Sequence, residues 1–184
     1  AQKHDLQVRL HGPISPQASQ WAKQDYRTPA ELNQIMTEFA TAFAMRFNNE
    51  PTIKWMDVVN ETILPNGKWF GPKKGTDKWE NPWLKMGLDE NGYPLYILKA
   101  FEIATKHATN IKLVYNQNAG MQTEMWEKLK ETILYIRSKG YRVDGIGWQA
   151  HIGLSPTTKA LKENTDLELK KLSKLIDWAH QNDL

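Results

Sequence analysis

Hydrophobic and polar positions follow two different periods along this chain, and each change of period marks a new element. Residues 6–10 alternate between apolar and polar side chains, which predicts a short strand. Residues 28–48 carry apolar side chains three and four positions apart, the spacing of a helix with one buried face. The Thr-Pro-Ala-Glu run at 28–31 matches a capping box, so we expect the helix to begin there. Residues 53–59 are a compact apolar run, typical of a buried strand, that leads into an Asn and then Glu61.

A long connection follows this strand. Residues 62–91 are rich in glycine, proline, lysine and tryptophan and have no sustained period, and loops of this length are often functional. Periodicity then resumes and predicts, in order, a helix over 93–107, a strand over 111–115, a helix over 121–139, a strand over 143–147 and a helix over 165–180. Gly140 is expected to end the second of these helices, and Thr165 with Glu168 is expected to cap the last one.

Four predicted strands therefore alternate with four predicted helices, which is the pattern of a parallel sheet with right-handed crossovers and places the chain in the α/β class. In such folds the chemistry lies at the carboxyl ends of the strands, in barrels and open sheets alike. The polar residues that follow a predicted strand end are His11, Asn60, Glu61, Asn116, Gln149 and His151. These six residues are the first candidates for a functional site.

Composition narrows the class of protein. The 184 residues, 40% of them hydrophobic, can bury one core, so residues 1–184 are expected to form a single domain. A net charge of +3, with acids and bases interspersed, gives little support to nucleic-acid binding. The absence of cysteine and the wide spacing of the five histidines argue against a metal site. No apolar run reaches the roughly 20 residues that a membrane span requires.

The strongest chemical signal is the carboxylate that follows the strand at 53–59. A strand end gives Glu61 a rigid mount, and partial burial disfavours the charged form of a carboxyl group, so such a glutamate can donate a proton to a leaving oxygen. The alternative is a glutamate that only caps a turn. Asp57 lies inside the same strand, where a buried carboxylate is more often paired than catalytic.

Three ordered segments resemble glycoside hydrolase family 10, the endo-β-1,4-xylanase family. The run WMDVVNE at 55–61 is similar to the family's WDVVNE strand, KLVYN at 112–116 to its KLxxN strand, and GIGWQAH at 145–151 to its GIGFQxH strand. The family fold is a (β/α)8 barrel, whose complete form needs roughly 250 residues and eight strands. The resemblance implies that this chain holds about four β/α units, similar to the family's strands three to six.

The resemblance also implies roles for the candidate residues. Glu61 matches the family's general acid/base and Asn60 the amide that binds the sugar hydroxyl beside the cleaved bond. The family's remaining rim positions are matched by His11, Asn116, Gln149 and His151, the last of which orients the nucleophilic carboxylate. The implied reaction is hydrolysis of β-1,4-linked xylan, or a related plant polysaccharide, with retention of configuration and without a cofactor. A secreted, cell-surface or periplasmic location follows from the polymeric substrate.

The nucleophile of the family, a glutamate at the end of its seventh strand, has no match in this chain. We therefore expect the isolated chain to be inactive unless a second segment or chain completes the barrel. Two alternatives remain open. One is a non-hydrolytic, carbohydrate-binding remnant of the same fold. The other, a different barrel glycosidase whose strand ends in Asn-Glu, is disfavoured by the GIGWQAH run.

Aromatic side chains in the long connection are further candidates. Flat ring faces suit the C–H faces of pyranose rings, so one or two of the aromatic residues Trp69, Phe70, Trp79 and Trp83 are predicted to offer a platform for the leaving-group side of the sugar chain. The alternative for each tryptophan is that it anchors the loop to the barrel. After His11 the chain also departs from the family pattern, since the usual Trp and second His are missing, which leaves strict specificity for xylan open.

Overall fold

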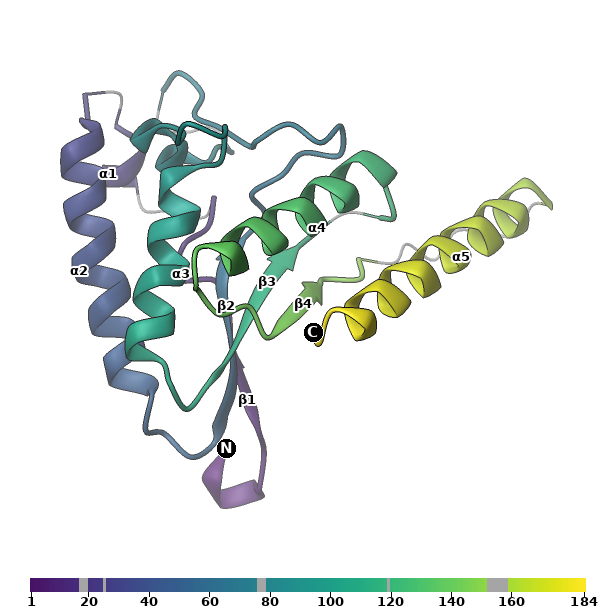
Figure 1. Ribbon diagram of the computed structural model, residues 1–184, viewed down its shortest axis with the longest axis horizontal. Helices are drawn as coiled ribbons and strands as arrows, with labels where there is room; N and C mark the ends of the chain where they lie inside the picture. The colour runs from purple at the N-terminus through teal and green to yellow at the C-terminus, as the bar shows by residue number, and fades with distance from the viewer. Residues whose placement is uncertain (17–19, 25, 76–78, 119, 152–158) are drawn as a thin grey trace.

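A computed structural model describes residues 1–16, 20–24, 26–75, 79–118, 120–151 and 159–184. Its centre is a sheet of four parallel strands in the order β1-β2-β3-β4, so that neighbours in sequence are neighbours in space (Figure 1). The strands are β1 (Val8–Leu10), β2 (Ile53–Asn60), β3 (Lys112–Gln117) and β4 (Gly145–Trp148). This sequential parallel order is the arrangement of a (β/α) barrel in which about four units are present.

Helices connect successive strands. The α-helices are α1 (Gln20–Lys23), α2 (Pro29–Phe47), α3 (Leu95–His107), α4 (Thr123–Ser138) and α5 (Lys159–Gln181), and two short 3-10 helices are η1 (Gln2–His4) and η2 (Pro82–Met86). Helices α2 and α3 pack against each other, whereas α5 extends away from the sheet beyond β4 (Figure 1). Within the described residues, the predicted helices and strands are present in the predicted order, and the short segments α1, η1 and η2 are additional to them.

One hydrophobic core lies between the sheet and its helices. In β3, the side chains of Leu113, Tyr115 and Gln117 are fully buried and alternate with Val114 and Asn116, which face the opposite side of the sheet. The first set packs toward helices that contribute their own apolar stripes to the same core. The second set faces the side that the helices leave uncovered, and its last member lies at the carboxyl end of the strand.

The boundaries of two helices show what local sequence signals can specify. At α2 the capping box is confirmed, because Thr28 accepts from the backbone N–H of Glu31 while the Glu31 carboxylate accepts from the N–H of Thr28. The second expected box is wrong, since α5 begins at residue 159 and Thr165 lies inside it. Glu168 instead accepts from the backbone N–H of Met121 at 2.8 Å, and so ties α5 to the start of α4.

Candidate active site at the strand ends

The carboxyl ends of β2, β3 and β4 meet along one edge of the sheet. Asn60 pairs in register with Asn116, and Asn116 pairs with Gly147. The backbone N–H of Glu61 donates to the carbonyl oxygen of Asn116 at 3.2 Å, so the turn that follows β2 is held against β3. Gln149 follows β4 directly, and its N–H donates to the carbonyl oxygen of Gln117 at 3.0 Å. Residues from three separate strands are thereby brought together.

An irregularity in β2 decides which side chains reach this edge. In a regular strand, residues three positions apart point to opposite faces, so Asp57 and Asn60 would lie on opposite sides of the sheet. The register between β2 and β3 shifts between Asp57 and Val59, as in a β-bulge. With this extra residue, Asp57 and Asn60 both join one polar network on the face opposite the helices.

Side-chain amides connect the predicted catalytic residues to one another. Gln149 donates from Nε2 to Glu61 Oε1 at 2.8 Å and to Asn60 Oδ1 at 2.9 Å. The same Asn60 oxygen accepts from Asn116 Nδ2 at 2.8 Å. His151 completes the group, with its Nε2 2.7 Å from Gln149 Oε1. Five of the six strand-end candidates therefore belong to one continuous hydrogen-bonded cluster.

The cluster is buried and its backbone is held in an unusual conformation. Asn60 is 0% exposed and Glu61 only 7%, which excludes most water from the amide contacts. Glu61 has φ of 51° and Ala150, between Gln149 and His151, has φ of 49°. Non-glycine residues rarely adopt this left-handed region, and when they do they are often found at functional sites. These two turns follow β2 and β4, and the side chains of Glu61 and Gln149 meet between them.

Asp57 and His11 form a second part of the same rim. Asp57 is 1% exposed, and its Oδ2 lies 2.9 Å from His11 Nδ1 while its Oδ1 accepts from Arg9 Nε at 2.6 Å. The prediction that Asp57 is a paired, buried carboxylate is confirmed. Arg9 also donates from Nη2 to Asn116 Oδ1 at 2.9 Å, so it links the Asp57 pair to the amide cluster. All six strand-end candidates are thus connected.

An open pocket of about 410 Å³ lies over this rim. Its lining consists of Arg9, His11, Asp57, Asn116, Trp148, Gln149 and His151. Arg9 and Trp148 are functional candidates that sequence analysis missed. For Trp148, its position one residue before Gln149 was a usable signal. For Arg9, the only signal was a polar residue in a three-residue strand.

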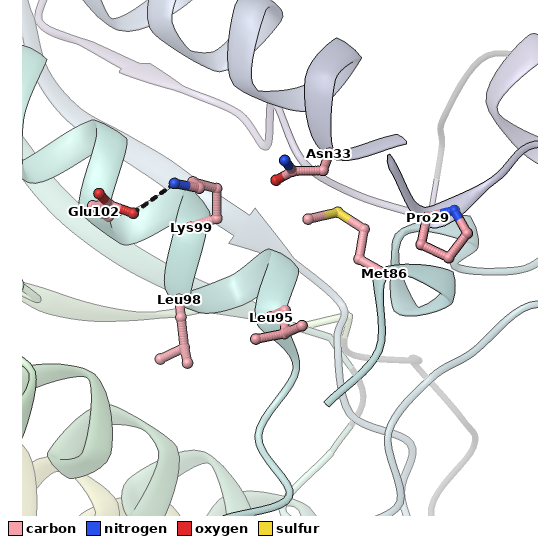
Figure 2. Close-up of a pocket in the computed structure, with 7 residues that line it drawn as sticks. All are labelled: Pro29, Asn33, Met86, Leu95, Leu98, Lys99 and Glu102. Carbon is pink, nitrogen blue, oxygen red and sulfur yellow. Dashed lines mark hydrogen bonds and ion pairs between the residues drawn. The ribbon is translucent and has the colours of Figure 1, made fainter. Parts of the chain in front are cut away.

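Another pocket, of about 340 Å³, lies between α2 and α3 (Figure 2). Its polar residues include Lys99, whose ammonium group is 2.9 Å from the Glu102 carboxylate, and Asn33 on the facing helix. One of the two charged groups neutralises the other, and neither follows a strand end. We therefore place the site at the strand ends.

The connection after Glu61 is fixed by buried polar contacts from β3. Gln117 accepts from the backbone N–H of Thr62 at 3.1 Å and donates to the carbonyl oxygen of Ile63 at 2.7 Å. The hydroxyl groups of Thr62 and Tyr115 are 2.5 Å apart. Burial raises the pKa of the Tyr115 phenol far above its usual value, so this hydroxyl stays protonated and available for the contact. These contacts hold the residues next to Glu61 in place.

Comparison with known proteins identifies the family of this chain. The family model described as Glycosyl hydrolase family 10 matches residues 1–178. The chain belongs to glycosyl hydrolase family 10. The family fold is the (β/α)8 barrel, and the four parallel strands with their helices are part of it. The resemblance inferred from three strand motifs is therefore confirmed.

Relatives of the family 10 chain include several xylanases. The protein described as Endo-1,4-beta-xylanase A of Thermoanaerobacterium saccharolyticum is 29% identical over an alignment that covers 94% of this chain and 14% of that protein. A namesake from Humicola insolens is 27% identical, with 83% of this chain and 37% of that protein covered. The chain thus spans well under half the length of these curated relatives.

Solved structures show the same fold. A mutant of the intracellular xylanase from Thermoanaerobacterium saccharolyticum, in complex with xylotetraose, superposes with a TM-score of 0.68 at 22% identity, covering 94% of this chain and 52% of that one. A GH10 endoxylanase from a sugarcane soil metagenome gives 0.66 at 21% identity, covering 92% and 48%. The chain spans about half of each.

The three tryptophans of the long connection have different surroundings in this family 10 chain. Trp83 is 4% exposed and donates its indole N–H to the carbonyl oxygen of Ser15 at 3.2 Å. It anchors the connection and has no open ring face, so its assignment to a sugar platform is corrected. Trp69 is half-buried, bonds the Gly92 carbonyl oxygen through its indole N–H, and contacts Tyr93 edge to face. Trp79 is 46% exposed and keeps an accessible ring.

In the described residues, no three His, Cys, Asp or Glu side chains lie close enough together to hold a metal ion. Within the same residues, no helix combines the length and the apolar character needed to cross a membrane.

Proposed function

We propose that the chain supplies the acid/base half of a retaining glycoside hydrolase that cleaves β-1,4-linked xylan or a related polysaccharide. The observation that carries this proposal is the position of Glu61. Its carboxyl group is 7% exposed, lies at the carboxyl edge of a parallel sheet, and accepts an amide N–H from Gln149 at 2.8 Å. A carboxyl group held at this edge by a neutral donor suits the transfer of one proton to and from a sugar oxygen.

The reaction proceeds in two displacements. In the first, a carboxylate attacks the anomeric carbon while the Glu61 carboxyl group gives its proton to the leaving glycosidic oxygen, and a covalent glycosyl-enzyme forms. In the second, Glu61, now a carboxylate, takes a proton from water as the water oxygen displaces the first carboxylate. Acid and base are the same group in opposite protonation states. The reaction needs no cofactor.

The attacking carboxylate comes from outside residues 1–184 in this proposal. Asp57 is the other carboxylate of the described rim, and both of its oxygens are engaged, one by Arg9 and one by His11. A nucleophile needs a free oxygen that faces the sugar. A segment or second chain that completes the barrel would supply it, at the roughly 5–5.5 Å from Glu61 that retention requires. We assign His151, which lines the pocket, to orienting this carboxylate.

The substrate class rests on the relatives and on the rim. Proteins named as xylanases share the fold, and the structure of one of them holds xylotetraose. In this chain His11, Asn116 and Gln149 line the pocket, and the buried Asn60 accepts hydrogen bonds from the last two. We assign these four residues to binding of the sugar hydroxyl groups, and the exposed Trp79 and half-buried Trp69 to the leaving-group side. Action outside the cell is proposed because the substrate is a polymer.

Hydrolysis assays on the full-length protein test the proposal. We expect new reducing ends from xylan and from xylotetraose, faster than from cellotetraose, and we expect the first product seen by proton NMR to be the β-anomer. An α-anomer as first product would contradict a retaining mechanism.

The alternative function, a binding remnant without turnover, is tested in parallel by calorimetry with xylotetraose. Binding by both the full-length protein and the 184-residue chain, with no new reducing ends from either, would favour the remnant. The absence of both binding and turnover would contradict both functions.

A further inference from the structure

The hydrogen bonds of the amide cluster run in one donor-to-acceptor direction. A group at one end of the cluster must set that direction. A side-chain amide carries a donor on one side and an acceptor on the other, so reversing one amide forces its hydrogen-bonded neighbours to reverse as well. Asn116, Asn60 and Gln149 form such a series. Asn60 Oδ1 accepts from both neighbours, and Gln149 in turn presents an N–H to Glu61 Oε1. If the series reversed, Glu61 would face a carbonyl oxygen instead.

Two ends of the series cannot set its direction throughout the reaction. His151 contacts Gln149 Oε1 through Nε2, and this ring nitrogen donates or accepts according to its tautomer. Glu61 fixes the direction only as a carboxylate, which solely accepts. In the acid form it carries a proton that it can donate, so it then accommodates either face of the Gln149 amide. The proposed mechanism passes through both forms.

Arg9 is different because a guanidinium group only donates. Its Nη2 lies 2.9 Å from Asn116 Oδ1, which compels the oxygen of this amide to face Arg9 and the nitrogen to face Asn60. The orientation then propagates through Asn60 to Gln149. The same orientation turns the buried Asn60 Nδ2 away from both neighbours, and this atom has no hydrogen-bond partner among the residues that the structure describes. The oxygen of Asn60 is required by two donors, so its nitrogen must point away from them.

The fold holds Arg9 in this position in two ways. Asp57, 1% exposed, accepts from Arg9 Nε at 2.6 Å and anchors the guanidinium group, although the Arg9 side chain itself is 41% exposed. Gly147 on β4 provides the space. A Cβ atom at Gly147 would overlap both Arg9 Nη2 and Asn116 Oδ1, whereas one at Gly145 would meet only Val114 at an ordinary 3.7 Å.

We propose that Arg9 is a positioning residue that acts through Asn116 and Asn60 to keep the N–H of Gln149 on Glu61 in both protonation states of that carboxyl group. The inference rests on the proposed function for its consequence in catalysis. The orientation itself is a property of the 184-residue chain. Arg9 does not touch the reacting atoms in this account, and its effect is transmitted entirely by the direction of the amides.

The test compares Arg9→Lys with Arg9→Gln. Lysine, like arginine, only donates, whereas glutamine donates and accepts and so leaves the direction of the series free. In the full-length protein we expect Arg9→Gln to lower kcat about tenfold, as for one hydrogen bond to a charged group, with KM changed less than about twofold. Arg9→Lys should restore most of the lost kcat. Equal kcat values for the two variants would overturn the proposal.

A second measurement does not depend on turnover. The side-chain amide resonances of Asn60, Asn116 and Gln149 are followed by NMR in the 184-residue chain. We expect one set of signals in the wild type and in Arg9→Lys, and a second set or exchange broadening in Arg9→Gln. Unchanged amide signals in Arg9→Gln would overturn the positioning role of Arg9 even if the protein hydrolyses xylan. If the wild-type protein does not hydrolyse xylan, the proposed function fails, but the amide signals still test whether Arg9 sets the orientation of the amides.

Two controls separate orientation from stability. If Arg9→Gln destabilises the fold by removing the guanidinium group from the buried Asp57 carboxylate, the double variant Arg9→Gln, Asp57→Asn removes the buried charge, and the amide signals are read there under the same criteria. The second control is Arg142, whose guanidinium group donates to the Ile111 carbonyl oxygen and to Asp144 near the amino ends of β3 and β4. Arg142→Gln should lower stability and leave the three amide signals unchanged. A shift of those signals in Arg142→Gln equal to that in Arg9→Gln would count against a specific role for Arg9.

Discussion

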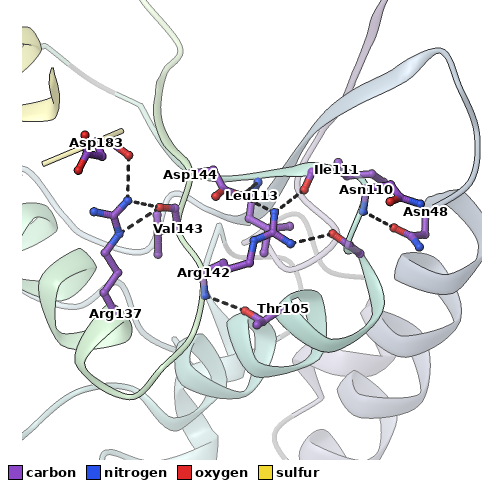
Figure 3. A network of polar contacts seen from close by, with 11 residues as sticks. Asn48, Thr105, Asn110, Ile111, Leu113, Arg137, Arg142, Val143, Asp144 and Asp183 are labelled. Carbon is purple, nitrogen blue, oxygen red and sulfur yellow. Dashed lines mark hydrogen bonds and ion pairs between the residues drawn. The ribbon is translucent and has the colours of Figure 1, made fainter.

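The two ends of the sheet each hold an arginine in a polar network, but the partners differ. At the end opposite the pocket, Arg142 donates to the backbone carbonyl oxygens of Ala108 at 3.3 Å and Ile111 at 2.9 Å (Figure 3). Its guanidinium group also donates to Asp144, whose carboxylate accepts from the N–H of Leu113 as well. At the pocket end, Arg9 binds a side-chain carboxylate and a side-chain amide.

This difference separates two uses of the same residue type. The directions of backbone carbonyl groups are fixed by the backbone conformation. Arg142 therefore stabilises that conformation and does not select between two orientations of its partners. Side-chain amides have two directions of nearly equal geometry, so Arg9 adds orientation. In (β/α) barrels the carboxyl end of the sheet carries chemistry and the amino end carries stability. The two arginines follow that division.

The largest expected effect on stability is at Arg142. Its replacement by methionine leaves two carbonyl oxygens and the Asp144 carboxylate without this donor, and we expect the free energy of unfolding to fall by about 2 kcal/mol. Urea unfolding at pH 7 measures it. The amide signals of the pocket end should not move. A loss below about 0.5 kcal/mol would show that water replaces the arginine at this end of the sheet.

A smaller effect is expected from Gly147→Ala, which tests the space at the pocket end. The added methyl group overlaps Arg9 and Asn116, and forcing extra volume into a packed site costs typically about 1–3 kcal/mol. We expect a loss near the lower bound, because the Arg9 side chain can move, together with altered amide signals of Asn116. Gly145→Ala is the matched control on the same strand and should be tolerated. Equal effects of the two substitutions would contradict the close approach at Gly147.

The smallest effect is expected at Glu168, which ties α5 to α4. Its hydrogen bond from the backbone N–H of Met121, then its contact with Lys171, lowers the pKa of the carboxyl group below its usual value of 4.5. A lowered pKa in the folded state contributes stability that is present above the unfolded pKa and lost as pH falls through the folded pKa. Glu168→Gln should therefore reduce the free energy of unfolding at pH 7 by less than about 1 kcal/mol, because the group is near the surface.

The pH dependence provides the check on Glu168. The difference in unfolding free energy between wild type and Glu168→Gln should shrink as pH falls below about 4.5. Exchange of the Met121 backbone amide with solvent should be faster in the variant at pH 7. Glu131→Gln, another helix carboxylate in a surface ion pair, is the control. A difference that grows toward low pH would contradict the assigned cause.

Sequence analysis predicted the parts of this molecule that depend on local pattern and on general rules of topology. The helices and strands follow from apolar spacing, and Glu61, Asn60 and Gln149 meet because the ends of neighbouring parallel strands share an edge. The Asp57 pairing follows from the rule that buried carboxylates find partners. These predictions needed no knowledge of side-chain packing.

The role of Arg9 could not be predicted in that way. It depends on a partner 107 residues away, on a shift of register between Asp57 and Val59, and on the missing side chain of Gly147. None of these leaves a periodic signal in the sequence. Glu168 is a similar case. The local sequence pattern predicted a helix cap at this residue, whereas its carboxylate accepts a tertiary hydrogen bond from the backbone N–H of Met121.

The most direct test of the account is the dependence of the Glu61→Gln variant on the leaving group. We predict that this variant of the full-length protein loses roughly 100-fold to 10,000-fold in kcat/KM on xylan, whose leaving oxygen needs a proton, and retains the glycosylation rate on dinitrophenyl β-xylobioside, whose leaving group does not. Equal losses on both substrates, with the thermal unfolding of the variant unchanged, would contradict Glu61 as the proton donor.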